Sequence, residues 1–188
     1  MNTCHLAKRI IALCATIFAF TSCGGAASTG PQTSDEPGQT SSGGEISDFA
    51  LKDVDGRTHA LSDYLGDKVI VLSFWATWCE PCKKEMTGLQ KLYEEHADKG
   101  LIILSISMDE PEYQGEVRPF VKQRGFTFPV LLDTESLVTN QFNPRRSAPY
   151  NMIISRQQKT VWSHEGYVPG DEQKLEAAIL DALDLLKP

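Results

Sequence analysis

Residues 74–85 read FWATWCEPCKKE, with two cysteines separated by two residues. Directly before the cysteines, Val69–Phe74 is a continuous β-branched and aromatic run, which is typical of a strand buried on both faces of a sheet. A helix is expected after them, ending at about Asp98, with one apolar face formed by Met86, Leu89, Tyr93 and His96. The two cysteines therefore stand where a buried strand turns into a helix.

This position favours redox chemistry at Cys79 and Cys82. Cys79 lies at the expected helix N-terminus, where the helix dipole and free backbone N–H groups stabilise a thiolate, the reactive form of cysteine. Pro81 falls at an early helical position, where the N–H that proline lacks is not needed. Cys82 is one turn further on, close enough to attack a mixed disulfide held on Cys79. The neighbouring Trp75 and Trp78 are expected to form the apolar surroundings of the thiols.

The spacing alone also suits half of a zinc site. Three of the five cysteines precede the folded part of the chain, so the remaining pair has no disulfide framework around it and is either catalytic or half of a metal site. A zinc ion needs four ligands. The other candidates are His59, His96 and His164, none of them in a close-spaced ligand arrangement. We therefore expect no metal site.

The first 22 residues are expected to be a lipoprotein signal peptide. Lys8 and Arg9 precede an apolar stretch over residues 10–20, which fits a signal peptide and is too short to span a membrane. Thr21-Ser22-Cys23 resembles a bacterial lipobox, in which the cysteine is acylated and becomes the mature N-terminus. The alternative is ordinary cleavage near Ala26-Ala27, with Cys23 lost.

The rest of the chain divides into a linker and one domain. Residues 23–44 are expected to comprise the lipidated cysteine, from the lipobox resemblance, and a flexible linker, because small and polar residues dominate after Cys23. Residues 45–188 are expected to form the domain, with strands alternating with helices in an α/β arrangement around a mixed sheet. The further elements expected are a hairpin around Asp55-Gly56, a strand over 101–107, a helix over 113–124, a strand over 129–132, a helix over 137–142, a hairpin of 150–154 and 160–163, and a last helix that includes 175–186.

Composition narrows the function classes. The 188 residues carry a net charge of −7 and no basic block, which argues against a nucleic-acid binder. No apolar run reaches the roughly 20 residues that a membrane-spanning helix needs. A single domain with a real core fits this length.

Segment 74–85 resembles the active-site segment of the thioredoxin superfamily, and its C-E-P-C version is similar to that of the ResA/TlpA-type thiol-disulfide oxidoreductases. The resemblance runs from about Phe49 to Leu186. It implies a thioredoxin-like α/β fold, with a central mixed sheet flanked by helices, an N-terminal β-hairpin and a central insertion over 108–132.

The same resemblance implies roles for the residues of the site. Cys79 and Cys82 would be the catalytic dithiol, and their redox-active disulfide would take the place of any cofactor. Glu80 and Pro81, which lie between the two cysteines, would tune the reduction potential of the dithiol. Pro149, after Ala148, matches the cis-proline that faces the cysteines in this family.

A further residue is needed to transfer protons to and from the dithiol. Ser73 stands where thioredoxins have a buried aspartate, so the proton must be handled elsewhere. The resemblance assigns this role to Glu110, after the following strand, with Asp109 as the next candidate. The alternative is that both are solvated loop acids.

The function implied is that of a membrane-tethered thiol-disulfide oxidoreductase of the bacterial cell envelope, on the periplasmic or extracytoplasmic face. Its partners would be protein disulfides, a membrane thiol-disulfide electron donor, and the bilayer through acylated Cys23. Cytochrome c maturation is one compatible role. A peroxiredoxin-like thiol peroxidase is an alternative, although its P-x-x-x-T-x-x-C pattern is absent, since Thr77 is only two residues before Cys79. A Sco-like copper-binding module is another, although it needs C-x-x-x-C.

Overall fold

The computed structural model describes residues 46–184. The expected signal peptide, Cys23 with its linker, and residues 185–188 lie outside the described part, so the expectations for them stay predictions. No helix within residues 46–184 is long and apolar enough to cross a membrane.

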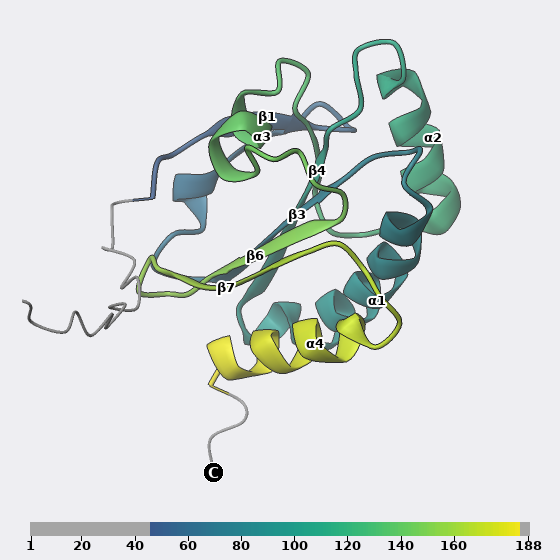
Figure 1. Ribbon diagram of the computed structural model, residues 1–188. Helices are drawn as coiled ribbons and strands as arrows, with labels where there is room; N and C mark the ends of the chain where they lie inside the picture. The colour runs from purple at the N-terminus through teal and green to yellow at the C-terminus, as the bar shows by residue number, and fades with distance from the viewer. Residues whose placement is uncertain (1–45, 185–188) are drawn as a thin grey trace, which may run out of the picture. The chain divides into compact units, whose positions relative to one another are not determined.

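Seven strands within these residues form one mixed sheet: β1 (Ala50–Asp53), β2 (Thr58–Ala60), β3 (Val69–Trp75), β4 (Leu101–Ser107), β5 (Val130–Leu132), β6 (Tyr150–Ile154) and β7 (Thr160–Glu165). Their spatial order is β2-β1-β5-β4-β3-β6-β7 (Figure 1). β4 pairs in parallel with β3 and β5, whereas the other neighbouring strands pair antiparallel. The expected central mixed sheet and N-terminal hairpin are confirmed.

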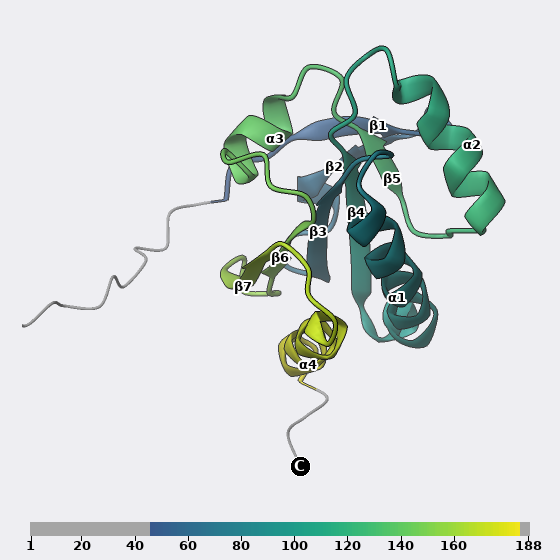
Figure 2. The same ribbon diagram turned by 45° about the vertical axis from the view of Figure 1, so that its right-hand side comes forward.

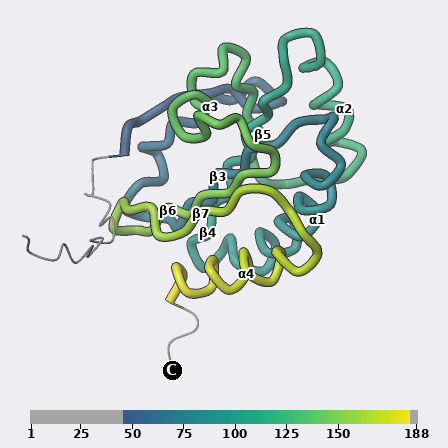
Figure 3. Tube along the Cα trace, viewed as in Figure 1, coloured from purple at the N-terminus to yellow at the C-terminus, as the bar shows by residue number. Residues whose placement is uncertain are grey.

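Helices cover both faces of the sheet. They are α1 (Glu80–His96), α2 (Gln114–Arg124), α3 (Leu137–Phe142) and α4 (Asp171–Ala182), with short 3₁₀ turns at Leu61–Asp63 and Ala97–Lys99. Successive side chains of β3 point to opposite faces. Val69 and Val71 therefore pack in a cluster with residues of α1, α2 and α4, whereas Ile70 and Leu72 pack in a second cluster with α3. Figure 2 shows α1 and α3 on opposite sides of the sheet, and the trace in Figure 3 follows α4 alongside α1.

The centre of the sheet positions the cysteine segment. β3 and β4 are buried along their whole length, and they run parallel with Trp75 opposite Ser107. Because parallel strands end at the same edge, the loop after β3 and the segment after β4 lie side by side. The backbone N–H of Met108 donates to the carbonyl of Trp75 at 2.8 Å. Ligand sites of open α/β sheets form at such carboxyl ends of strands.

The end of α1 differs slightly from the expectation. The helix ends at His96 instead of about Asp98, and a 3₁₀ turn then leads to Gly100, whose φ is 100°. A Cβ at Gly100 would stand 2.6 Å from Nη2 of Arg156, which donates to the carbonyl of Lys99 at 2.9 Å. The positive φ favours glycine at this position, and the guanidinium of Arg156 would have to shift to make room for a side chain.

The central insertion contributes α2 and β5. β5 extends the sheet between β4 and β1. Arg118 and Lys122 of α2 form ion pairs of 3.2 and 2.8 Å with Asp55, in the turn between β1 and β2. The insertion is thus connected to the N-terminal hairpin as well as to the sheet.

Candidate active site

Cys79 and Cys82 meet at the start of α1 and form a disulfide, with 5.3 Å between their Cα atoms. Cys79 is the N-cap residue, and its Sγ accepts a hydrogen bond from the backbone N–H of Cys82 at 3.2 Å. Pro81 is in the first turn, where a backbone N–H would have no helical partner. Cys79 is 4% exposed and Cys82 is fully buried. Cys79 is therefore the sulfur nearer to solvent, at the helix end that stabilises a thiolate.

The residues expected around the dithiol lie in different environments. Trp75 is fully buried in the core cluster that contains both cysteines, and its ring centroid is 5.4 Å from that of Phe120. Trp78, which directly precedes Cys79, is 65% exposed, and its place in the surroundings of the thiols stays a prediction. Glu80 is exposed and forms an ion pair with Lys83 at 2.7 Å.

Pro149 lies at the same end of the sheet as the dithiol. The peptide bond between Ala148 and Pro149 is cis, and Pro149 is buried. Pro149 directly precedes β6, which pairs antiparallel with β3 so that Tyr150 is opposite Phe74. Because Phe74 is close to the end of β3 that leads to Cys79, the cis-proline turn and the start of α1 share one edge.

Asp109 fastens the active-site loop from the end of the neighbouring strand. Its buried carboxylate accepts the backbone N–H of Thr77 at 3.0 Å and the Thr77 hydroxyl at 2.6 Å. The Ser107 hydroxyl donates to its second oxygen at 2.9 Å. Because Thr77 is two residues before Cys79, these bonds help to set where α1 begins.

Glu110 lies at the surface beside this loop. It lines an open hollow of about 330 Å³ together with Trp78, Met108, Tyr113 and Arg146. The structure thus brings Glu110 to Trp78, the residue before Cys79. Its part in proton transfer stays a prediction.

Glu85 is a buried acid on the helix that carries the dithiol, and it was not predicted from the sequence. It follows Cys82 by one turn of α1 and is 4% exposed. Its Oε2 is buried without a hydrogen-bond partner among the described residues. Burial raises the pKa of Glu85 to about 7, although the Asn151 amide and His164 favour the carboxylate. A carboxyl group with this pKa can take up or release a proton near neutral pH.

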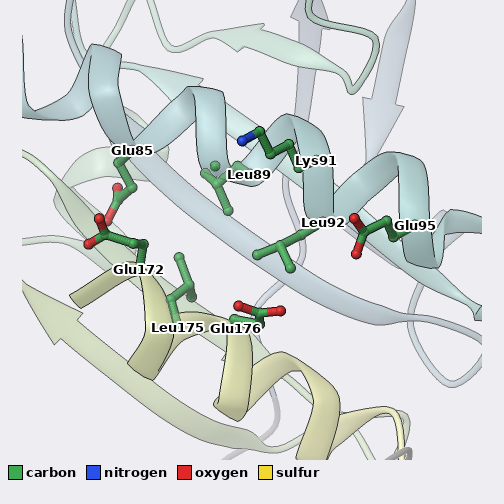
Figure 4. Close-up of a pocket in the computed structure, with 9 residues that line it drawn as sticks. Glu85, Leu89, Lys91, Leu92, Glu95, Glu172, Leu175 and Glu176 are labelled. Atoms are coloured by element: carbon green, nitrogen blue, oxygen red, sulfur yellow. The ribbon is translucent and has the colours of Figure 1, made fainter. Parts of the chain in front are cut away.

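A cavity of about 230 Å³ between α1 and α4 reaches Glu85. Figure 4 shows the carboxylates of Glu85 and Glu172 on the two facing helices, with Leu89 and Leu175 beside them. Glu85 therefore borders open space on the α4 side and is not enclosed by packed side chains on every side.

The candidate metal ligands have other partners in the described residues. The ring nitrogens of His59 lie 3.0 Å from Asp53 and 2.7 Å from the hydroxyl of Tyr64. Nε2 of His164 lies 3.0 Å from Asp171. Within residues 46–184, no three His, Cys, Asp or Glu side chains are grouped so that they could hold a metal ion.

Comparison with known proteins places the chain in a family. Residues 42–163 match the model of the AhpC/TSA family. The chain belongs to the AhpC/TSA family. The thiol-disulfide oxidoreductase ResA of Bacillus subtilis (strain 168) is 33% identical over 148 residues, which cover 79% of this chain and 77% of that protein.

Two further likenesses complete the comparison. ResA of Geobacillus kaustophilus (strain HTA426) is 40% identical over 101 residues, 54% of this chain, and the match spans little more than half (56%) of that relative. A solved candidate thiol:disulfide interchange protein DsbE from Chlorobium tepidum superposes with a TM-score of 0.67 at 30% identity, covering 75% of this chain and 96% of that one. The predicted thioredoxin-like fold and the resemblance to ResA are confirmed.

Proposed function

We propose that the protein is a thiol-disulfide oxidoreductase that reduces protein disulfides through Cys79 and Cys82. The observation that carries the proposal is the disulfide between these cysteines at the N-terminus of α1, at the sheet edge that also holds cis-Pro149. The names of the ResA and DsbE relatives describe the same chemistry. The redox-active disulfide is the only cofactor that this reaction needs.

The reaction passes two electrons from the dithiol to the substrate. The Cys79 thiolate attacks one sulfur of the substrate disulfide, and the other substrate sulfur leaves as a thiolate and takes up a proton. A mixed disulfide then joins Cys79 to the substrate. Cys82 loses its proton and attacks the sulfur of Cys79, which releases the reduced substrate and closes the Cys79–Cys82 disulfide.

The proton of buried Cys82 needs an acceptor, and Glu85 is the strongest candidate. Glu85 is one helical turn from Cys82, and its pKa of about 7 matches a neutral working pH. Exposed Glu110, which the family resemblance assigns, is the competing candidate.

The place of action that we propose is the extracytoplasmic face of the bacterial cell envelope. Acylated Cys23 would tether the domain to the bilayer, with residues 24–44 as the spacer. A membrane thiol-disulfide donor would return two electrons and two protons to the Cys79–Cys82 disulfide after each cycle. Apocytochrome c is the substrate we propose first, which would place the protein in cytochrome c maturation. Support for these points comes from the residues before the domain and from the ResA resemblance.

An insulin reduction assay tests the activity. With dithiothreitol as the electron source, the wild type should accelerate insulin precipitation and Cys79→Ala should not. The same preparation is tested with hydrogen peroxide and with Cu(I). Consumption of peroxide without insulin reduction would favour a peroxiredoxin-like enzyme, and tight Cu(I) binding without insulin reduction would favour a Sco-like module. Either result would overturn the proposal.

A further inference from the structure

Glu80, the charged residue between the active-site cysteines, pairs with one cation and lies in the field of two others. Lys83 Nζ donates to Glu80 Oε1 at 2.7 Å. This hydrogen bond, together with the charges of Lys83, Arg124 and Lys84, lowers the pKa of Glu80 below its usual value. At neutral pH, Glu80 is therefore an ionised carboxylate with a positively charged neighbourhood.

Two of these cations lie over one aromatic ring of the insertion, that of Phe120. Lys83 Nζ lies 5.7 Å from the centroid of the Phe120 ring, and the guanidinium carbon of Arg124 lies 5.5 Å from it. Cations within about 6 Å of a ring face are attracted by the quadrupole of the ring. Phe120 is half-buried and packs against Trp75 in the core. The Phe120 ring thus contacts a lysine of α1 and an arginine of α2, and its packing against Trp75 fixes its position.

This arrangement distinguishes the Glu80 ion pair from an ordinary surface pair. Exposed ion pairs contribute little because two long side chains must be held in one geometry. The side chain of Lys83 is only 21% exposed, against 76% for Glu80. Lys83 is thus held by its surroundings more than Glu80 is, and the Phe120 ring is one of the groups that its ammonium packs on.

We propose that Phe120 is a positioning residue of the dithiol, which holds Lys83 and Arg124 at Glu80 and so raises the reduction potential of the Cys79–Cys82 pair. A negative charge next to Cys79 disfavours its thiolate, and held cations offset that charge. Stabilising the thiolate stabilises the reduced form, which makes the pair a weaker reductant. The inference takes from the proposed function only that this pair is redox-active.

The test measures the redox equilibrium of full-length variants with reduced and oxidised glutathione. Differential alkylation and mass spectrometry of the peptide that contains Cys79 and Cys82 give the fraction of disulfide, so the other cysteines do not interfere. Phe120→Leu is expected to shift the equilibrium about three-fold toward the disulfide. For a two-electron couple this is a potential about 14 mV more negative. Lys83→Met, which keeps an apolar stem without the charge, should shift it in the same direction.

Two comparisons isolate the mechanism. Phe126→Leu is the matched control, because the Phe126 ring also packs on that of Phe120, at 5.9 Å, and has no cation over it among the described residues. Its shift should be less than half that of Phe120→Leu. In a Glu80→Gln background, the shift caused by Phe120→Leu should also fall to less than half. An equal shift in the control, or an undiminished shift in the Glu80→Gln background, would overturn the inference.

The outcome remains decisive if a core variant folds poorly. Lys83→Met and Arg124→Gln change surface side chains, and an unchanged equilibrium in both would equally overturn the inference. Insulin reduction is measured on the same preparations. A protein that shows the expected shifts but reduces no insulin would contradict the proposed function and leave the role of Phe120 intact.

Discussion

Glu85→Gln should make the folded protein more resistant to unfolding at alkaline pH while changing little of its stability at acidic pH. The pKa of Glu85 is about 7 in the folded protein, against an ordinary value of 4.5. The raised pKa means that the folded state binds the proton more tightly than the unfolded chain does. The stability that the protonated carboxyl provides is fully present below the ordinary pKa and is lost as the pH rises through 7.

The size of the effect follows from the two pKa values. Each unit of difference corresponds to about 1.4 kcal/mol, so the full loss is about 3 kcal/mol at a pH well above 7. At pH 5 only about 1 kcal/mol of this is lost, because Glu85 is still protonated in the folded state. Between pH 5 and pH 8, the wild type should therefore lose roughly 2–3 kcal/mol relative to Glu85→Gln.

Urea unfolding of the oxidised proteins at a series of pH values measures this difference. A constant cost of burying the glutamine amide cancels when the two pH values are compared. Glu116→Gln, at an exposed position of α2, is the control and should follow the pH dependence of the wild type. Parallel stability profiles for the wild type and Glu85→Gln would refute the assignment of a buried Glu85 with a raised pKa.

Three further predictions concern the dithiol, the competing acid and the anchor. Cys82→Ala should accumulate mixed disulfides with substrate proteins on Cys79, visible on non-reducing gels, because nothing resolves them; equal adduct formation in Cys79→Ala would contradict the order of attack. Glu110→Gln should slow disulfide exchange and change its pH–rate profile if Glu110 moves protons, and an unchanged profile would leave it a surface acid. Cys23→Ser should abolish labelling with palmitate in a bacterial host, and equal labelling of mutant and wild type would exclude the lipid anchor.

Most elements of the fold could be predicted because the two central strands are buried on both faces. β3 and β4 are buried at every position, so each appears in the sequence as a run of apolar residues with at most small polar serines in it. The helix over Leu137–Phe142 and the strand over Leu101–Ser107 have the predicted ends. The end of α1 was predicted two residues too late, because the helix passes into a 3₁₀ turn over Ala97–Lys99 before Gly100.

Local sequence pattern predicts the site only where its residues are close in sequence, and the distant cis-Pro149 was predicted from the family resemblance. Cys79, Cys82 and Pro81 follow from one segment. The bond between Thr77 and Asp109 joins residues 32 positions apart, so no local pattern indicates that Asp109 holds the loop. Glu85 offered a weak signal: it follows Cys82 by three residues, on the face that also carries the buried Met86 and Leu89. That position predicts burial, against the usual preference of glutamate for solvent.

The two buried acids near the dithiol are suited to different tasks. Asp109 accepts hydrogen bonds from Thr77 and Ser107, so its carboxylate is occupied in holding the loop. Glu85 has a buried oxygen without a partner in the described residues and a pKa near neutrality, so it is free to exchange a proton. Ser73, on β3, leaves the strand without an acid at the thioredoxin position. An acid on α1 instead keeps a spacing of about 5–6 Å between its Cβ and that of Cys82, since residues three apart are neighbours on a helix. Because both residues belong to one helix, this spacing does not depend on how α1 packs against the sheet.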